Sequence, residues 1–116
     1  MKFFKQLFKG QPDYKIISSE ESMKLYKGEF EKDEILWGKV IEIRAFKRDH
    51  LAYDCICLGF HLSDNTTFEI DEEIEGYKET VELLPQLFEG IEENWFPEVA
   101  FPAFETNMTI IWTNNG

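Results

Sequence analysis

Cys55, Cys57 and His61 carry the side chains best suited to bind zinc, or to act as a nucleophile and its base. They occupy alternate positions of residues 53–62, where apolar alternation predicts a β-strand. At about 3.3 Å per residue, Cys55 and His61 lie roughly 20 Å apart along such a strand, too far to bind one ion. No second cysteine pair at metal-ligand spacing occurs in the chain. We therefore predict free thiols, no metal site and no cofactor.

The turn before this strand is the best candidate for a small-molecule site. Residues 47–50 mix both charges, and His50 is one of two histidines in the chain. A Cys–His nucleophilic pair needs an imidazole close to a thiol, so this end of the predicted sheet is the place to look for one. The predicted ligand-binding residues are Arg48, Asp49, His50 and Asp54. A solvated turn is the alternative interpretation, and we name no catalytic residue.

Acidic residues are concentrated in one segment. Residues 69–98 hold eleven Asp and Glu residues against Lys78 alone, a net charge of −10, and the whole chain carries −11. This charge disfavours contact with nucleic-acid phosphates and favours a basic protein partner. We predict that Glu72, Glu73 and Glu75 contact such a partner. The alternatives are a solvated helix entry and a DNA mimic that spaces carboxylates like phosphates.

An aromatic segment follows at residues 95–104. Pro97 and Pro102 make it unsuited to regular structure, and its rings make it too apolar to be fully solvated. We expect it either to cover the core as a lid or to expose its rings as a binding patch. In the second case Trp95 and Phe96 contact the partner, because exposed aromatic side chains are typical of interaction hot spots.

These residues must be positioned by a few strands and one helix. Alternating apolar residues predict three strands folded back and forth over residues 34–70, with a hairpin connection at 63–66. The middle strand turns Ile56, Leu58, Phe60 and Leu62 toward the core. Apolar residues at helical spacing predict a helix over Tyr77–Phe88, in which Pro85 is expected to cause a kink or a restart. Residues 109–112 predict a last strand.

The expected fold class is therefore α+β: an antiparallel β-meander packed against a C-terminal helix, with an irregular aromatic tail. Residues 14–17 predict a further short strand, and residues 18–26 fit either a capped helix or a strand. Residues 1–12 place Phe4, Leu7 and Phe8 at helical spacing between lysines, which predicts N-terminal amphipathic turns.

Length and composition predict one domain over residues 1–116, with a globular body at 13–112. Of the 116 residues, 43% are hydrophobic, enough for one packed core without disulfides or metal. No segment is long and apolar enough to span a membrane, and no signal-peptide cleavage site follows the basic N-terminus. We expect a cytoplasmic protein without nucleic-acid or membrane partners, and the sequence leaves its oligomeric state open.

Short strings carry two resemblances. Residues 45–49 (AFKRD), 54–58 (DCICL) and 101–107 (FPAFETN) resemble a group of small uncharacterised bacterial proteins of unknown function. Residues 35–43 (ILWGKVIEI), with the strands and helix that follow to residue 88, are similar to bacterial pleckstrin-homology-like domains. That fold ends near its helix, whereas this chain continues, and no phosphoinositide-type basic cluster is present. Neither resemblance implies an activity or a role for a residue.

The sequence favours a non-enzymatic function. It contains no phosphate-binding glycine loop, serine elbow or zinc helix motif. We predict a small acidic protein-binding module of the toxin-immunity or regulatory type, by similarity of type with small acidic bacterial proteins. The alternative is a small enzyme or ligand binder that uses the end of the sheet at residues 47–54.

Overall fold

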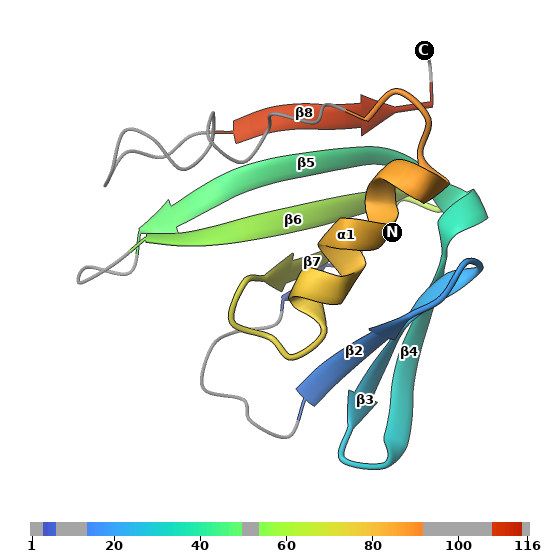
Figure 1. The fold of residues 1–116 in the computed structure, drawn as a ribbon, viewed down its shortest axis with the longest axis vertical. Helices are drawn as coiled ribbons and strands as arrows, with labels where there is room; N and C mark the ends of the chain where they lie inside the picture. The colour runs from blue at the N-terminus through green and yellow to red at the C-terminus, as the bar shows by residue number, and fades with distance from the viewer. Residues whose placement is uncertain (1–3, 7–13, 50–53, 92–107, 115–116) are drawn as a thin grey trace.

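The alternating segment at the centre of the chain forms one sheet. In the computed structural model, β5 (Val40–Asp49), β6 (Asp54–Leu62) and β7 (Thr67–Asp71) pair antiparallel in chain order, which confirms the predicted meander (Figure 1). β8 (Met108–Thr113) pairs antiparallel with β5, and β1 (Phe4–Gln6) pairs parallel with β7, so the order is β1-β7-β6-β5-β8. The structure describes residues 4–6, 14–49, 54–91 and 108–114.

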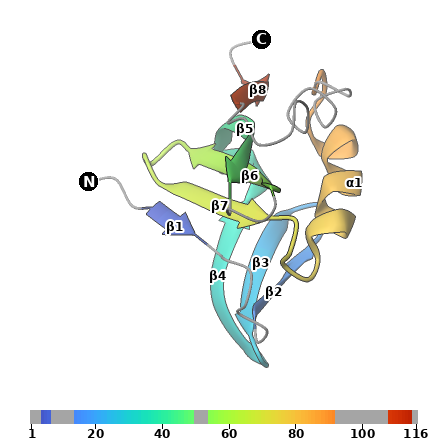
Figure 2. The same cartoon turned by 90° about the vertical axis from the view of Figure 1, so that its left-hand side faces the viewer.

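A second sheet is built from the residues before the meander. β2 (Tyr14–Ser18), β3 (Ser22–Lys27) and β4 (Phe30–Leu36) pair antiparallel in chain order. Of the two interpretations left open for residues 18–26, the strand is therefore correct. Figure 2 shows β2, β3 and β4 running away from the larger sheet, so that the helix lies in the angle between the two.

The predicted first strand of the meander is divided between the two sheets. A 3-10 turn, η1 (Trp37–Lys39), separates β4 from β5. The Trp37 indole N–H donates to the Ser19 carbonyl at 2.8 Å, and its ring centroid lies 5.7 Å from that of Phe60. These contacts hold the turn at the junction of the sheets. An alternation pattern alone cannot show them, because they join residues far apart in the chain.

The N-terminal turns were predicted wrongly where the structure describes them. Phe4–Gln6 is a strand, paired with residues 67–69 of β7. The edge of β7 offers unpaired backbone N–H and C=O groups, and satisfying them outweighs a helical spacing of only a few residues. The rest of the predicted N-terminal turns lies outside the described residues.

The predicted helix is confirmed as α1 (Tyr77–Leu87), which follows Gly76 and runs on through Pro85 without a restart. Gly76 has a φ of +95°, and a Cβ at this position would lie 2.0 Å from the Ile16 carbonyl oxygen. The Ile16 N–H also donates to the Glu75 carbonyl at 2.9 Å. Only glycine lets the chain pass this close to β2 as the helix begins. In the part of the chain that the structure describes, no helix is long and apolar enough to cross a membrane.

One hydrophobic cluster joins both sheets and α1. Its members include Ile16, Met23, Leu25 and Ile35 from the small sheet, Ile43, Leu58, Phe60 and Phe68 from the large sheet, and Tyr77 and Leu84 from α1. The predicted core face of β6 is confirmed, with Leu62 at its margin. Since Phe60 belongs to this cluster, α1 covers that face of the large sheet, and the opposite face points away from the helix.

Candidate functional site

The two cysteines that suggested a metal or redox site are buried. Cys55 and Cys57 are 0% and 2% exposed, and both are free thiols, as predicted. His61 lies further along β6, where its Nδ1 is 3.1 Å from the Thr67 hydroxyl. Among the residues that the structure describes, no group of three or more His, Cys, Asp or Glu side chains is placed to share an ion.

The predicted ligand-binding residues lie where β5 passes into β6. The register pairs Arg48 with Cys55 and Asp49 with Asp54, so the backbone brings the two aspartates opposite each other. Nothing further of these side chains is described, and His50 lies outside the described residues altogether. The ligand site at residues 48–54 therefore stays a prediction.

Lys47 does not belong to the exposed surface of that end. It pairs with Ile56, and it is 1% exposed. Alternate residues of a strand face opposite sides, so the buried Ile43 and Ala45 place Lys47 on the core side of the sheet. The mixed-charge grouping expected over residues 47–50 is corrected accordingly: its lysine points inward.

Six glutamates are exposed between the end of β7 and the residues just after α1. We call the side chains of Glu72, Glu73, Glu75, Glu79, Glu82 and Glu89 the acidic surface. Thr80 and Leu84 are buried on the other side of α1, so helical periodicity separates its packed face from its acidic face. Lys78 is the one basic residue among them.

One glutamate of this surface, Glu72, is hydrogen-bonded to the large sheet. The Glu72 carboxylate accepts a hydrogen bond from the Ile56 N–H at 3.0 Å, and the Glu72 N–H donates to the Ile56 carbonyl at 3.0 Å. The Glu73 N–H donates to the Asp71 carboxylate at 2.8 Å. Of the predicted partner-binding glutamates, Glu72 therefore extends the β6–β7 pairing, and its side chain has a structural role that sequence reasoning missed.

The acids on and just after α1 have no such hydrogen bond to the sheet. Within the described chain, Glu79, Glu82 and Glu89 make no ion pair. Glu79 lies in the first turn, where the helix dipole favours negative charge. Glu89 lies beyond the last turn, which holds no basic residue, so the carbonyl end of the helix faces another negative group. This arrangement opposes helix stability, because the dipole favours cations there.

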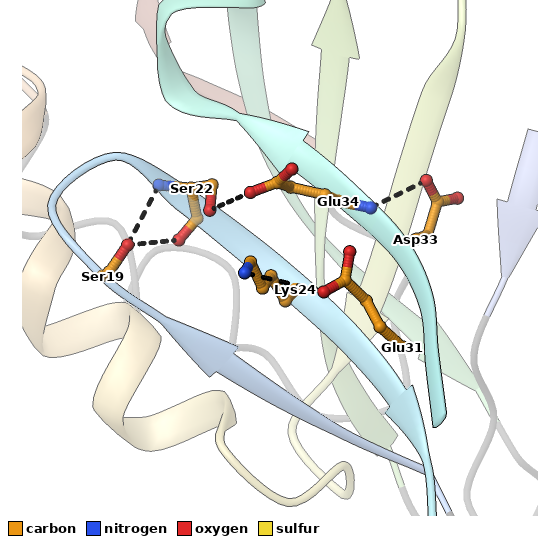
Figure 3. Close-up of polar contacts among 6 residues, drawn as sticks. All are labelled: Ser19, Ser22, Lys24, Glu31, Asp33 and Glu34. Atoms are coloured by element: carbon orange, nitrogen blue, oxygen red, sulfur yellow. Dashed lines mark hydrogen bonds and ion pairs between the residues drawn. The ribbon is translucent and has the colours of Figure 1, made fainter. Parts of the chain in front are cut away.

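In the small sheet, by contrast, several acidic side chains have partners (Figure 3). The Ser22 hydroxyl donates to the Glu34 carboxylate at 2.9 Å, and the Glu34 N–H donates to Asp33 at 2.9 Å. The Lys24 ammonium lies 3.5 Å from Glu31, and this carboxylate raises the pKa of Lys24. Each acid drawn there has a partner from the same sheet, so these contacts join neighbouring residues of β3 and β4.

A hollow of about 370 Å³ lies between β4 and the β6–β7 hairpin. Its acids are Asp33, Glu34 and Asp64. Asp64 accepts hydrogen bonds from the Thr66 hydroxyl at 2.6 Å and the Thr66 N–H at 3.0 Å, and these bonds lower the pKa of Asp64. Because its carboxylates already have partners, this hollow is a weak candidate for a charged ligand.

A second hollow, of about 430 Å³, lies on the face of the large sheet that points away from α1. We call it the outer hollow, and its lining residues are Glu42, Arg44, Phe46, Gly59, His61, Thr67, Glu69 and Met108. Sequence reasoning missed it. The available signal was Gly59 in the middle of a strand, where the absence of a side chain leaves space beside the backbone.

The Tyr77 hydroxyl is the one buried side-chain polar atom without a hydrogen-bond partner in the described part of the chain. Burial, together with the nearby Glu72 charge, raises the pKa of Tyr77. The phenol therefore stays protonated at neutral pH.

The predicted contacts Trp95 and Phe96 lie outside the described residues, so the choice between a lid and an exposed patch stays open.

The chain matches no protein-family model, and no curated protein or solved structure shows significant similarity to it. The two resemblances seen in short strings therefore stay predictions. Function has to be argued from the geometry and charge of the chain itself.

Proposed function

We propose that this protein is a small non-enzymatic module that binds a basic protein partner through its acidic surface. The observation that supports this most strongly is the contrast in charge pairing. Glu79, Glu82 and Glu89 make no ion pair within the described residues, whereas in the small sheet Glu31 forms an ion pair with Lys24 and Glu34 accepts a hydrogen bond from the Ser22 hydroxyl.

Repulsion between Glu79 and Glu82 opposes folding, and Glu89, just beyond the carbonyl end of α1, opposes the helix dipole. A basic partner would remove this repulsion on binding. It would also be attracted over a distance, because a field of one sign raises association rates in a salt-dependent way. These carboxylates would therefore gain an ionic contact on binding that they lack in the isolated chain.

Such a module suits a regulatory or toxin-immunity role, in which it covers a basic surface that the partner needs for its own activity. Buried free thiols at Cys55 and Cys57 suit a reducing cytoplasm, where disulfides are rare. The predicted contacts at Glu73 and Glu75 extend the same surface toward the sheet.

The test combines site-specific crosslinking with charge neutralisation. A photoreactive residue at Gln86, exposed on α1, is used to capture a partner from lysate of the native host, and the captured protein is identified and purified. Binding to the purified partner is then measured for the double variant Glu79→Gln/Glu82→Gln. We expect at least about a tenfold weaker affinity, from two lost charge contacts of roughly 1 kcal/mol each.

The matched control is Glu29→Gln/Glu31→Gln, which removes the same charge from the β3–β4 hairpin and should leave affinity unchanged. A partner that crosslinks equally well at residue 29, or that binds both variants alike, would show that net charge and not the acidic surface is recognised. A DNA-binding partner displaced from DNA in a salt-sensitive manner would instead identify the surface as a DNA mimic.

A further inference from the structure

We propose that β8 pairs with β8 of a second copy of this chain, so that two large sheets join into one. β8 is an edge strand, and among the described strands it pairs with β5 alone (Figure 1). The far side of an edge strand presents N–H and C=O groups that can pair with a further strand. The pairing needs no residue of the acidic surface.

β8 differs in charge from β4, an edge strand of the small sheet. The charged residues of β4 are Glu31, Lys32, Asp33 and Glu34, and its pairing with β3 shifts register by a bulge beside them. Charged side chains and bulges are the usual means by which an edge strand avoids pairing. β8, residues 108–113 (MTIIWT), has no charged residue. Of these two edges, β8 is therefore the one suited to accept another strand.

Two large apolar side chains are exposed along β8. Met108 is 59% exposed and Ile110 is 49% exposed. They pair with Phe46 and Arg44 of β5, so both lie on the face of the large sheet that points away from α1. The Met108 sulfur is 3.8 Å from an Arg44 guanidinium nitrogen, which covers only part of the side chain. Covering these two residues would remove apolar surface from water.

The spacing of the two residues is self-complementary. In an antiparallel pair centred on Thr109, Met108 of each copy lies opposite Ile110 of the other copy. Directly opposite residues share a face, so the exposed side chains cover each other on the face away from α1. The two Thr109 residues also lie opposite each other, and Thr–Thr is a favourable cross-strand pair. The same surface thus serves both copies, as a two-fold dimer requires.

Charge also favours contact between copies at this edge. A chain with a net charge of −11 repels its own copy wherever acidic surfaces meet. β8 is uncharged, and the charged residues of β5 that pair with it, Glu42 and Arg44, form an ion pair with each other. Two copies can therefore meet along β8 without bringing like charges together, whereas contact between two α1 helices would place acids against acids.

β8 is held in position before it pairs. The Trp112 indole N–H donates to the Glu89 carbonyl at 3.1 Å, and the ring centroids of Trp112 and Phe88 lie 4.7 Å apart. A strand that is already ordered loses less entropy on association. Two six-residue strands form a contact smaller than the roughly 1,200 Å² of a stable interface, so we expect a weak, concentration-dependent dimer.

The joined sheet would place both copies of α1 on one side, because opposite residues of the two β8 strands share a face. A partner with two basic surfaces could then contact both acidic surfaces at once, and the second contact would raise its apparent affinity. This consequence rests on the proposed function, whereas the pairing of β8 does not.

The first experiment measures the mass of the full chain by sedimentation equilibrium up to about 1 mM, at low and high salt. We expect the average mass to rise from 13.7 kDa toward twice that value, and to rise further at high salt, which screens the repulsion between two acidic copies. Ile110→Lys should weaken dimerisation at least about tenfold. Ile17→Lys is the matched control, because Ile17 is 51% exposed on β2 and its substitution should leave dimerisation unchanged.

The second experiment locates the register by cysteine crosslinking. Thr109→Cys should form a disulfide-linked dimer under mild oxidation, because opposite Cα atoms of an antiparallel pair lie about 4.5–5.5 Å apart, within disulfide range. Thr113→Cys, on the same strand, should stay monomeric, because the two copies of residue 113 would lie roughly 26 Å apart in this register. The native Cys55 and Cys57 are buried, and the unsubstituted chain controls for them.

A chain that stays monomeric at about 1 mM at both salt concentrations would overturn the proposal. Equal crosslinking at residues 109 and 113, or a dimer that Ile17→Lys weakens as much as Ile110→Lys, would also overturn it. A monomeric chain whose photoreactive residue at position 109 crosslinks to another protein in host lysate would assign the edge to that protein instead. Unchanged partner binding by Glu79→Gln/Glu82→Gln would contradict the proposed function and leave the dimer measurements unaffected.

Discussion

The acids on and just after α1 differ from two acids of the β3–β4 hairpin, Glu31 and Glu34, in whether the fold gives their carboxylates a partner. On the hairpin, Glu31 and Glu34 are paired with Lys24 and Ser22. Glu79 and Glu82 on α1, and Glu89 just after it, make no ion pair with any described residue. The number of acidic residues in a region therefore says little about its function. What matters is which acids the fold leaves without a compensating group.

Each region has a glycine with a positive φ, but the space around the two glycines differs, and this difference gives the largest expected effect. Gly76→Ala should destabilise the protein by about 3 kcal/mol or more, because the new Cβ would meet the Ile16 carbonyl and the positive φ would be strained. Gly28→Ala, in the hairpin, should cost only about 1 kcal/mol, since its φ is +60° but nothing lies within 4 Å. Urea denaturation of both variants measures the difference. Equal losses would mean that α1 can move away from β2 at little cost.

A smaller effect, of opposite sign in the two regions, is expected from neutralising single acids. Glu89→Gln should raise the free energy of unfolding by about 0.5 kcal/mol, because it removes a negative charge from the carbonyl end of α1. Glu31→Gln should lower the melting temperature slightly, because it removes the partner of Lys24. Thermal unfolding at low and high salt is the measurement, and high salt should reduce both changes. Two changes of the same sign would contradict the contrast between the regions.

The smallest effect concerns one acid with hydrogen-bond partners. Hydrogen bonds from Thr66 lower the pKa of Asp64, so the folded state binds its proton less readily than the unfolded chain does. The stabilisation is therefore present above the unfolded pKa and is lost as pH falls through the folded pKa. In an NMR titration, Thr66→Val should shift the Asp64 titration to higher pH. An unchanged titration would show that the Thr66 hydroxyl does not hold this carboxylate.

The central meander and α1 could be predicted from local pattern, whereas the second sheet and the sites could not. Alternation over residues 53–62 identified the central strand, and helical spacing located α1 to within a residue of its end. The division at Trp37 and the strand at Phe4–Gln6 depend on partners distant in the chain, which no local pattern contains.

The same limit applies to the candidate sites. The inward position of Lys47 follows from strand alternation, but only once the register of β5 is known. The outer hollow needs Arg44, Gly59 and Glu69 from three strands, so the sequence shows its parts without their arrangement. Glu72 appeared equivalent to its neighbours in the sequence, whereas its bond to the Ile56 N–H distinguishes it.

The order β1-β7-β6-β5-β8 has a consequence for synthesis of the chain. The edges of the large sheet come from residues 4–6 and residues 108–113, and each pairs with a strand about sixty residues away in sequence. On the ribosome, β5 has to wait for residue 113 before its outer edge is covered, and during that interval its N–H and C=O groups are open to other chains. Pairing over such long loops is slow to form. We therefore expect the newborn chain to be most prone to aggregation just before β8 emerges.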